Sequence, residues 1–68
     1  MGQLTMIHFL IVAAIRELGG KAKLDQIYEK LNECGDAPSK NYVEHLLFEL
    51  SVEGIVKKTD EGEWVINE

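Results

Sequence analysis

The sequence predicts an α+β fold, mainly helical, with a small β-hairpin at its C-terminal end. Three observations support this fold. Apolar residues recur at helical spacing through three segments, Gly or Pro signals separate these segments, and the apolar period changes after Gly54. The 68 residues have room for a single domain spanning 1–68. We expect residues 1–4 to be disordered or to be a cloning remnant.

The first expected helix runs from Thr5 to Leu18. Its apolar residues fall on one broad face, at positions 7, 10, 11, 14, 15 and 18. Thr5 is a suitable N-cap because its hydroxyl can accept a hydrogen bond from the first turn. Gly19 and Gly20 end the helix, since glycine adopts the left-handed cap conformation without penalty. A short extended segment follows at 21–23.

A second helix is expected at 25–33, followed by a Gly- and Pro-containing turn at 33–38. Ser39 then caps a third helix that runs to about position 53 and stops at Gly54. Two β-prone segments, 55–59 and 63–66, are joined by a loop short enough for a hairpin. We expect the core to contain Leu10, Ile11, Leu18, Ile27, Leu31, Val43, Leu47, Leu50, Ile55 and Trp64.

Composition and charge make some classes of function unfavourable for this chain. The net charge of −5 is unfavourable for nucleic-acid binding, because affinity there comes largely from neutralising phosphates. The single cysteine, Cys34, cannot form an internal disulfide. We read it as a turn residue, with a redox role as the alternative, and expect a cytoplasmic protein with no membrane segment. No triad or metal-ligand spacing is apparent, so we expect no enzyme, metal or cofactor.

The order of elements resembles the winged helix-turn-helix superfamily. The resemblance rests on the segment from Ser39 to Val56, which reads Ser-Lys-Asn-Tyr-Val-Glu-His-Leu-Leu-Phe-Glu-Leu-Ser-Val-Glu-Gly-Ile-Val, and on Leu18–Ile27. It covers residues 5–67 and extends to two subfamilies, the N-terminal winged helix of Mrr-type restriction proteins and the HARE-HTH domain. The latter tends to end in a Gly-x-Trp pattern like Gly62-Glu63-Trp64. The resemblance implies a three-helix winged fold whose third helix is the recognition helix.

As a DNA-binding protein, the chain would use the start of the third helix and the hairpin. Lys40 and Ser39 can contact phosphates, while Asn41 or His45 would face base edges. Glu44 and the acidic loop Asp60-Glu61 oppose this reading, and a plain solvated helix is the alternative. The complete set of expected contacts is Ser39, Lys40, Asn41, His45, Lys57 and Lys58.

Two helices carry more apolar surface than one small core needs. The excess residues are expected to form a homodimer or partner interface, mainly on the first helix. The alternative is a three-helix core that wraps both sides of each helix. The expected interface residues are Phe9, Val12, Ala13, Phe48 and Val52.

Two functions therefore remain open. The first is a small dimeric DNA-binding transcriptional regulator that binds double-stranded DNA. The second is an acidic winged-helix module, an adaptor or polymerase-associated protein, that binds another protein and not DNA. The distribution of the basic residues discriminates between them. A continuous positive patch formed by Arg16, Lys21, Lys23, Lys40 and one of Lys57 or Lys58 would favour DNA, whereas basic residues scattered among acidic ones would favour a protein partner.

Overall fold

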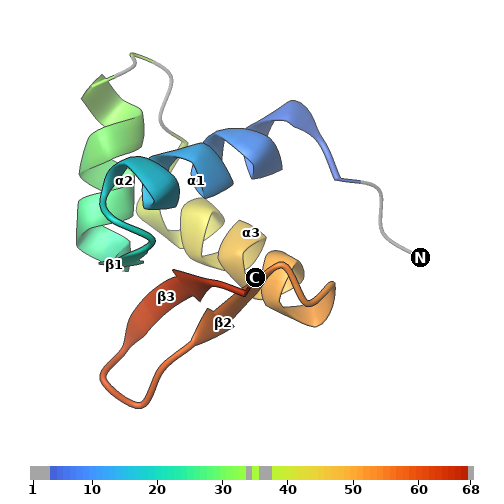
Figure 1. Cartoon of the computed structure of the whole chain (residues 1–68). Coiled ribbons are helices and arrows are strands. Elements are labelled where there is room, and N and C mark those ends of the chain that lie inside the picture. The colour runs from blue at the N-terminus through green and yellow to red at the C-terminus, as the bar shows by residue number, and fades with distance from the viewer. Residues whose placement is uncertain (1–3, 34, 36–37, 68) are drawn as a thin grey trace.

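Three helices and a three-stranded antiparallel sheet form the fold (Figure 1), in a computed structural model that describes residues 4–33, 35 and 38–67. The expected α+β fold with a small hairpin is confirmed. The elements in chain order are α1 (Met6–Glu17), β1 (Lys21–Lys23), α2 (Leu24–Glu33), α3 (Lys40–Val52), β2 (Val56–Lys58) and β3 (Glu63–Ile66). Residues 34, 36 and 37 of the expected turn, Cys34 among them, lie outside the described residues, as do residues 1–3 and 68.

Local signals set the ends of α1. Thr5 is the N-cap residue, as expected, and its backbone N–H donates to Nδ1 of His8 at 3.0 Å. At the other end Gly20 has a φ of +94°, and its N–H donates to the carbonyl of Ile15 at 2.9 Å. The same carbonyl also accepts from the backbone N–H of Leu18 at 3.1 Å, so the residues that follow the helix bond back to its last turn, as is typical of a glycine-terminated helix.

The ends of α3 also agree with the sequence. The Ser39 hydroxyl accepts a hydrogen bond from the backbone N–H of Tyr42 at 3.3 Å, so Ser39 is the expected N-cap. Gly54 has a φ of +82°, and the next N–H, that of Ile55, donates to the carbonyl of Leu50 at 3.0 Å. The chain therefore turns sharply after α3 and enters the hairpin.

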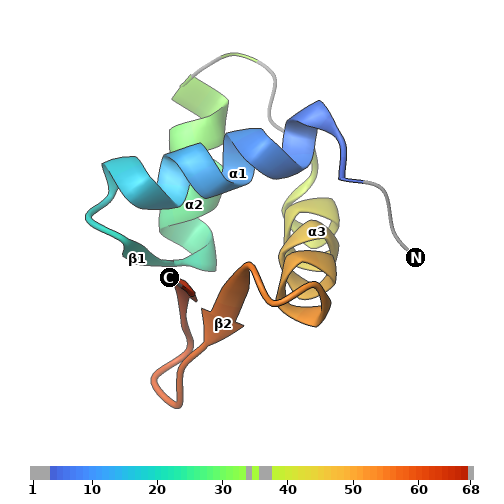
Figure 2. The same ribbon diagram turned by 45° about the vertical axis from the view of Figure 1, so that its right-hand side comes forward.

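The sheet has the order β1-β3-β2, with β3 paired to both of its neighbours. Trp64 in β3 lies opposite Ala22 on one side and Lys58 on the other. The hairpin loop between β2 and β3 projects away from the helices in both views, and α1 crosses α2 and α3 (Figure 2). The short extended segment after α1 is thus the third strand of the sheet.

The core lies where α1, α2 and α3 meet the inner face of the sheet. Seven of the ten expected core residues are buried there. Leu18 and Ile55 are only half-buried, but both pack against the core. The prediction was wrong for Leu10, whose side chain is 44% exposed. The buried face of α1 is centred on Ile11 and Ile15, and at 100° per residue Leu10 lies at its margin.

Candidate interaction surfaces

A groove separates α3 from the β2–β3 hairpin. Residues of α3 form one wall and residues of the two strands form the other. We call it the α3–hairpin groove; its lining is Asn41, Glu44, His45, Phe48, Lys58 and Trp64. The ammonium of Lys58 lies 5.5 Å from the centre of the Trp64 ring, within the range of a cation–π contact. The groove thus combines one lysine, one carboxylate, two aromatic rings, an imidazole and an amide.

His45 is held in the groove by two neighbours on its own helix. Its ring stacks on that of Tyr42, with 6.5 Å between ring centres and 23° between planes. Its Nε2 atom lies 3.4 Å from Oε2 of Glu49, one turn further along α3. Both contacts follow from helical spacing, which places residues three or four positions apart on the same face.

Glu49 also reaches across to α1. Its Oε1 atom lies 2.9 Å from Nε2 of His8, a side chain that is almost fully buried. The Thr5 N–H donates to Nδ1 of His8, so Nδ1 has no proton in this arrangement. Nε2 therefore carries the ring proton and donates a hydrogen bond to Oε1 of Glu49. A chain of polar contacts thus runs from the N-terminus of α1, through His8 and Glu49, to His45 in the groove.

Lys40 is directed away from the groove. Its ammonium forms an ion pair with Asp25 of α2 and lies 6.0 Å from the centre of the Tyr28 ring. The hydrogen bond and the charge of Asp25 raise the pKa of Lys40 above its ordinary value of 10.5. The Ser39 hydroxyl is likewise engaged, because it caps α3. Two of the six expected DNA contacts therefore serve the fold at the junction of α2 and α3.

Other basic side chains are interspersed with carboxylates. Lys21 of β1 lies 3.8 Å from Glu63, and Lys30 of α2 lies 3.1 Å from Glu17 of α1. Lys57 neighbours Lys58 on a strand, where successive side chains point to opposite faces. Only Lys58 lines the groove. Of the expected DNA contacts, the structure brings together Asn41, His45 and Lys58, and it leaves Ser39, Lys40 and Lys57 outside.

The large apolar residues that are exposed lie on α1 and on α3. On α3, Phe48 and Val52 are 64% and 75% exposed, and Tyr42 is half exposed. Both of the α3 residues expected at an interface are therefore accessible.

On α1, Phe9 and Ala13 are exposed as expected, but Val12 is half-buried and packs against the core. Val12 was wrongly placed outside the core. The apolar residues missed on this surface are Leu10 and Met6, which is 73% exposed. At 100° per residue these two residues fall in the same arc of α1 as Phe9 and Ala13, so the sequence could have grouped all four on one side of the helix.

Two properties concern only the described part of the chain. No group of three His, Cys, Asp or Glu side chains there is placed to hold a metal ion. No helix there is long and apolar enough to cross a membrane.

Comparison of the sequence with models of known protein families and with curated proteins finds no match.

Proposed function

We propose that this chain is a non-catalytic protein-interaction module whose third helix binds a basic, partly apolar segment of another protein. The observation that supports this is the composition of the exposed face of α3. This face presents carboxylates beside large apolar side chains, and its single lysine is paired with Asp25 of α2. The residues concerned are Glu44, Phe48, Glu49, Val52 and, at the C-cap, Glu53.

Electrostatics favour a basic partner over a nucleic acid. The chain carries a net charge of −5, and Lys21, Lys30 and Lys40 lie against carboxylates. A phosphate backbone approaching α3 would meet Glu44 and Glu49 at close range. Repulsion by these carboxylates grows as the salt concentration falls. A lysine- or arginine-bearing segment gains attraction from the same charges and covers Phe48 and Val52.

A second candidate function is binding of double-stranded DNA, and one observation favours it. The α3–hairpin groove places Asn41, His45 and Lys58 together, and the first two project from the helix that would enter the major groove in a winged helix-turn-helix protein. Asn41 would read adenine and Lys58 would neutralise a phosphate. With so few cations the dependence of log affinity on log salt would be shallow, about 0.9 for each phosphate contact.

One titration separates the two functions. A synthetic amphipathic helical peptide of lysine and leucine and a mixed-sequence DNA duplex are each added to the full chain, at low and at physiological ionic strength. The signal is fluorescence of Trp64, which lines the groove and is the only tryptophan. We expect the peptide to bind and the duplex not to bind.

Two charge reversals complete this test. Glu44→Lys should weaken peptide binding severalfold, whereas Glu61→Lys, the same charge change at the hairpin loop, should leave it nearly unchanged. Duplex binding that is lost in Lys58→Ala would favour the DNA function instead. Failure of the peptide to bind even at high micromolar concentration would contradict the proposed function.

A further inference from the structure

The outer surface of α1 is unlike that of α2. Every exposed side chain of α1 from Met6 to Ala13 is apolar, whereas every exposed side chain of α2 is polar. A helix that faces water on its outer side normally carries polar residues there. We call the exposed apolar residues of α1 the outer stripe; they are Met6, Phe9, Leu10 and Ala13.

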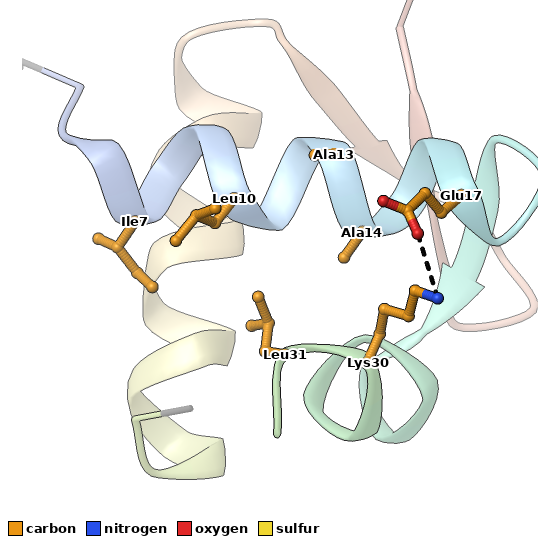
Figure 3. Close-up of a pocket in the computed structure, with 7 residues that line it drawn as sticks. All are labelled: Ile7, Leu10, Ala13, Ala14, Glu17, Lys30 and Leu31. Carbon is orange, nitrogen blue, oxygen red and sulfur yellow. Dashed lines mark ion pairs between the residues drawn. The ribbon is translucent and has the colours of Figure 1, made fainter. Parts of the chain in front are cut away.

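The outer stripe continues into a depression between α1 and α2. Figure 3 shows Leu10 and Ala14 of α1 directed toward Leu31 of α2, and the ion pair between Glu17 and Lys30 at the far end. The full lining is Ile7, Leu10, Ala13, Ala14, Glu17, Lys30 and Leu31. The stripe and the depression form one mostly apolar surface with charge confined to one end.

We propose that this surface binds a second copy of the chain, with the two α1 helices packed antiparallel through the outer stripe, around a two-fold axis that crosses the stripe midway between Leu10 and Ala13. The spacing of residues along α1 supports this arrangement. Leu10 and Ala13 lie at equal distances on either side of that axis, so the large side chain of each copy faces the small one of the other. Such alternation allows two helices to approach closely.

Charge complementarity supports the same arrangement. Met6 and Glu17 also lie at equal distances from the axis, at opposite ends of α1. In the antiparallel pair, Glu17 of each copy therefore lies beside the first turn of the other copy's α1. That turn contains no acidic residue, and the positive end of a helix dipole favours a nearby carboxylate. A parallel pair would instead place Glu17 beside its own equivalent.

The size of the surface predicts a weak dimer. The large side chains of the stripe are between 44% and 73% exposed, and a phenylalanine contributes at most about 250 Å². The stripe and its borders are therefore smaller than the roughly 800 Å² per partner of a typical stable complex. We expect a dissociation constant in the micromolar range. The inference uses no residue of the α3–hairpin groove, so it does not depend on the proposed function.

Sedimentation equilibrium of the full chain, from low to high micromolar concentration, tests the proposal. The wild type should approach twice its monomer mass of 7.7 kDa. Ala13→Glu should raise the dissociation constant by a factor of about 100 or more, because it buries an uncompensated charge between the helices. Asn32→Glu adds the same charge on the exposed face of α2 and should leave association unchanged.

A mixing experiment tests the antiparallel geometry. Residues 13 of the two copies lie less than one helical turn apart along the axis of the pair. A13E and A13K should therefore each be monomeric alone and should form a heterodimer when mixed. Circular dichroism checks that each variant is folded, and Phe9→Gln serves as a milder second variant of the stripe.

The opposite results would overturn the proposal. A wild type that stays monomeric at high micromolar concentration would show that a second copy does not bind the stripe. A dimer that survives Ala13→Glu uses a different surface. Two folded variants at position 13 that fail to associate when mixed would exclude the antiparallel pair.

Discussion

The hydrogen bond between His8 and Glu49 makes a quantitative prediction about stability. His8 is 5% exposed, and its Nε2 atom donates to Glu49 across 2.9 Å. Glu49→Ala removes the acceptor and leaves a buried N–H without its partner, which costs about 1–3 kcal/mol. Glu49 itself is half exposed, so water can reach part of the site. We therefore expect the lower half of that range for Glu49→Ala.

Two related substitutions, Glu49→Gln and His8→Ala, should cost less and more, respectively, than Glu49→Ala. Glu49→Gln retains an acceptor oxygen at the same place, so it should cost less than about 1 kcal/mol. His8→Ala also removes a packed ring from between α1 and α3, so it should cost about 2–4 kcal/mol. A domain of this size has only about 3–5 kcal/mol available from its core. His8→Ala is therefore expected to be close to unfolding.

Urea denaturation followed by circular dichroism and by Trp64 fluorescence measures each value. The double-mutant cycle of Glu49→Ala with His8→Phe, each of which removes one partner of the bond, should give a coupling energy of about 0.5–1.5 kcal/mol. Glu44→Ala is the control, because Glu44 is an exposed carboxylate on the same helix. If Glu49→Ala is no more destabilising than Glu44→Ala, the bond to His8 contributes nothing and the reasoning fails.

Three further predictions rest on particular residues. Leu47→Ala should destabilise the fold by about 2–5 kcal/mol, because Leu47 is fully buried; Leu10→Ala should cost clearly less, and equal losses in urea denaturation would contradict the burial of α1 described above. Gly62→Ala should cost about 1–2 kcal/mol, since Gly62 has a φ of +82°, and an unchanged melting temperature would refute this. The raised pKa of Lys40 means that its pairing with Asp25 stabilises the fold below pH 10.5 and is lost as the pH rises through the higher folded-state value. The stability difference between wild type and Lys40→Met should therefore shrink above pH 10.5, and a difference that persists would show that the pair is not its source.

Features that depend on local sequence were predictable. Ser39 caps α3 through its own hydroxyl, and Gly54 provides the positive φ that ends the helix. Both are decided by the chemistry of one residue and its immediate neighbours. The same holds for His45 and Glu49, whose contact follows from their separation by four positions on a helix.

Features that depend on tertiary packing were not predictable. Leu10 and Val12 were assigned to the wrong sides of α1, because helical spacing gives the width of an apolar face and not the direction of the core. His8 and Glu49 are 41 positions apart, so nothing local indicates that they meet. Lys40 was expected to contact the phosphates of DNA. The packing of α2 against α3 instead brings Asp25 close enough to form an ion pair with it.

The order β1-β3-β2 makes β1 and β2 the two edge strands of the sheet. Each is only three residues long and carries two lysines: Lys21 and Lys23 on one, Lys57 and Lys58 on the other. An edge strand has unpaired backbone N–H and C=O groups that can pair with a strand of another molecule. Short edge strands that carry lysines disfavour this pairing. Four of the seven basic residues of the chain are thus placed where they guard against amyloid-like stacking. Replacing the lysines of β2 with valine or threonine would keep the fold and make fibril formation on storage the foreseeable failure.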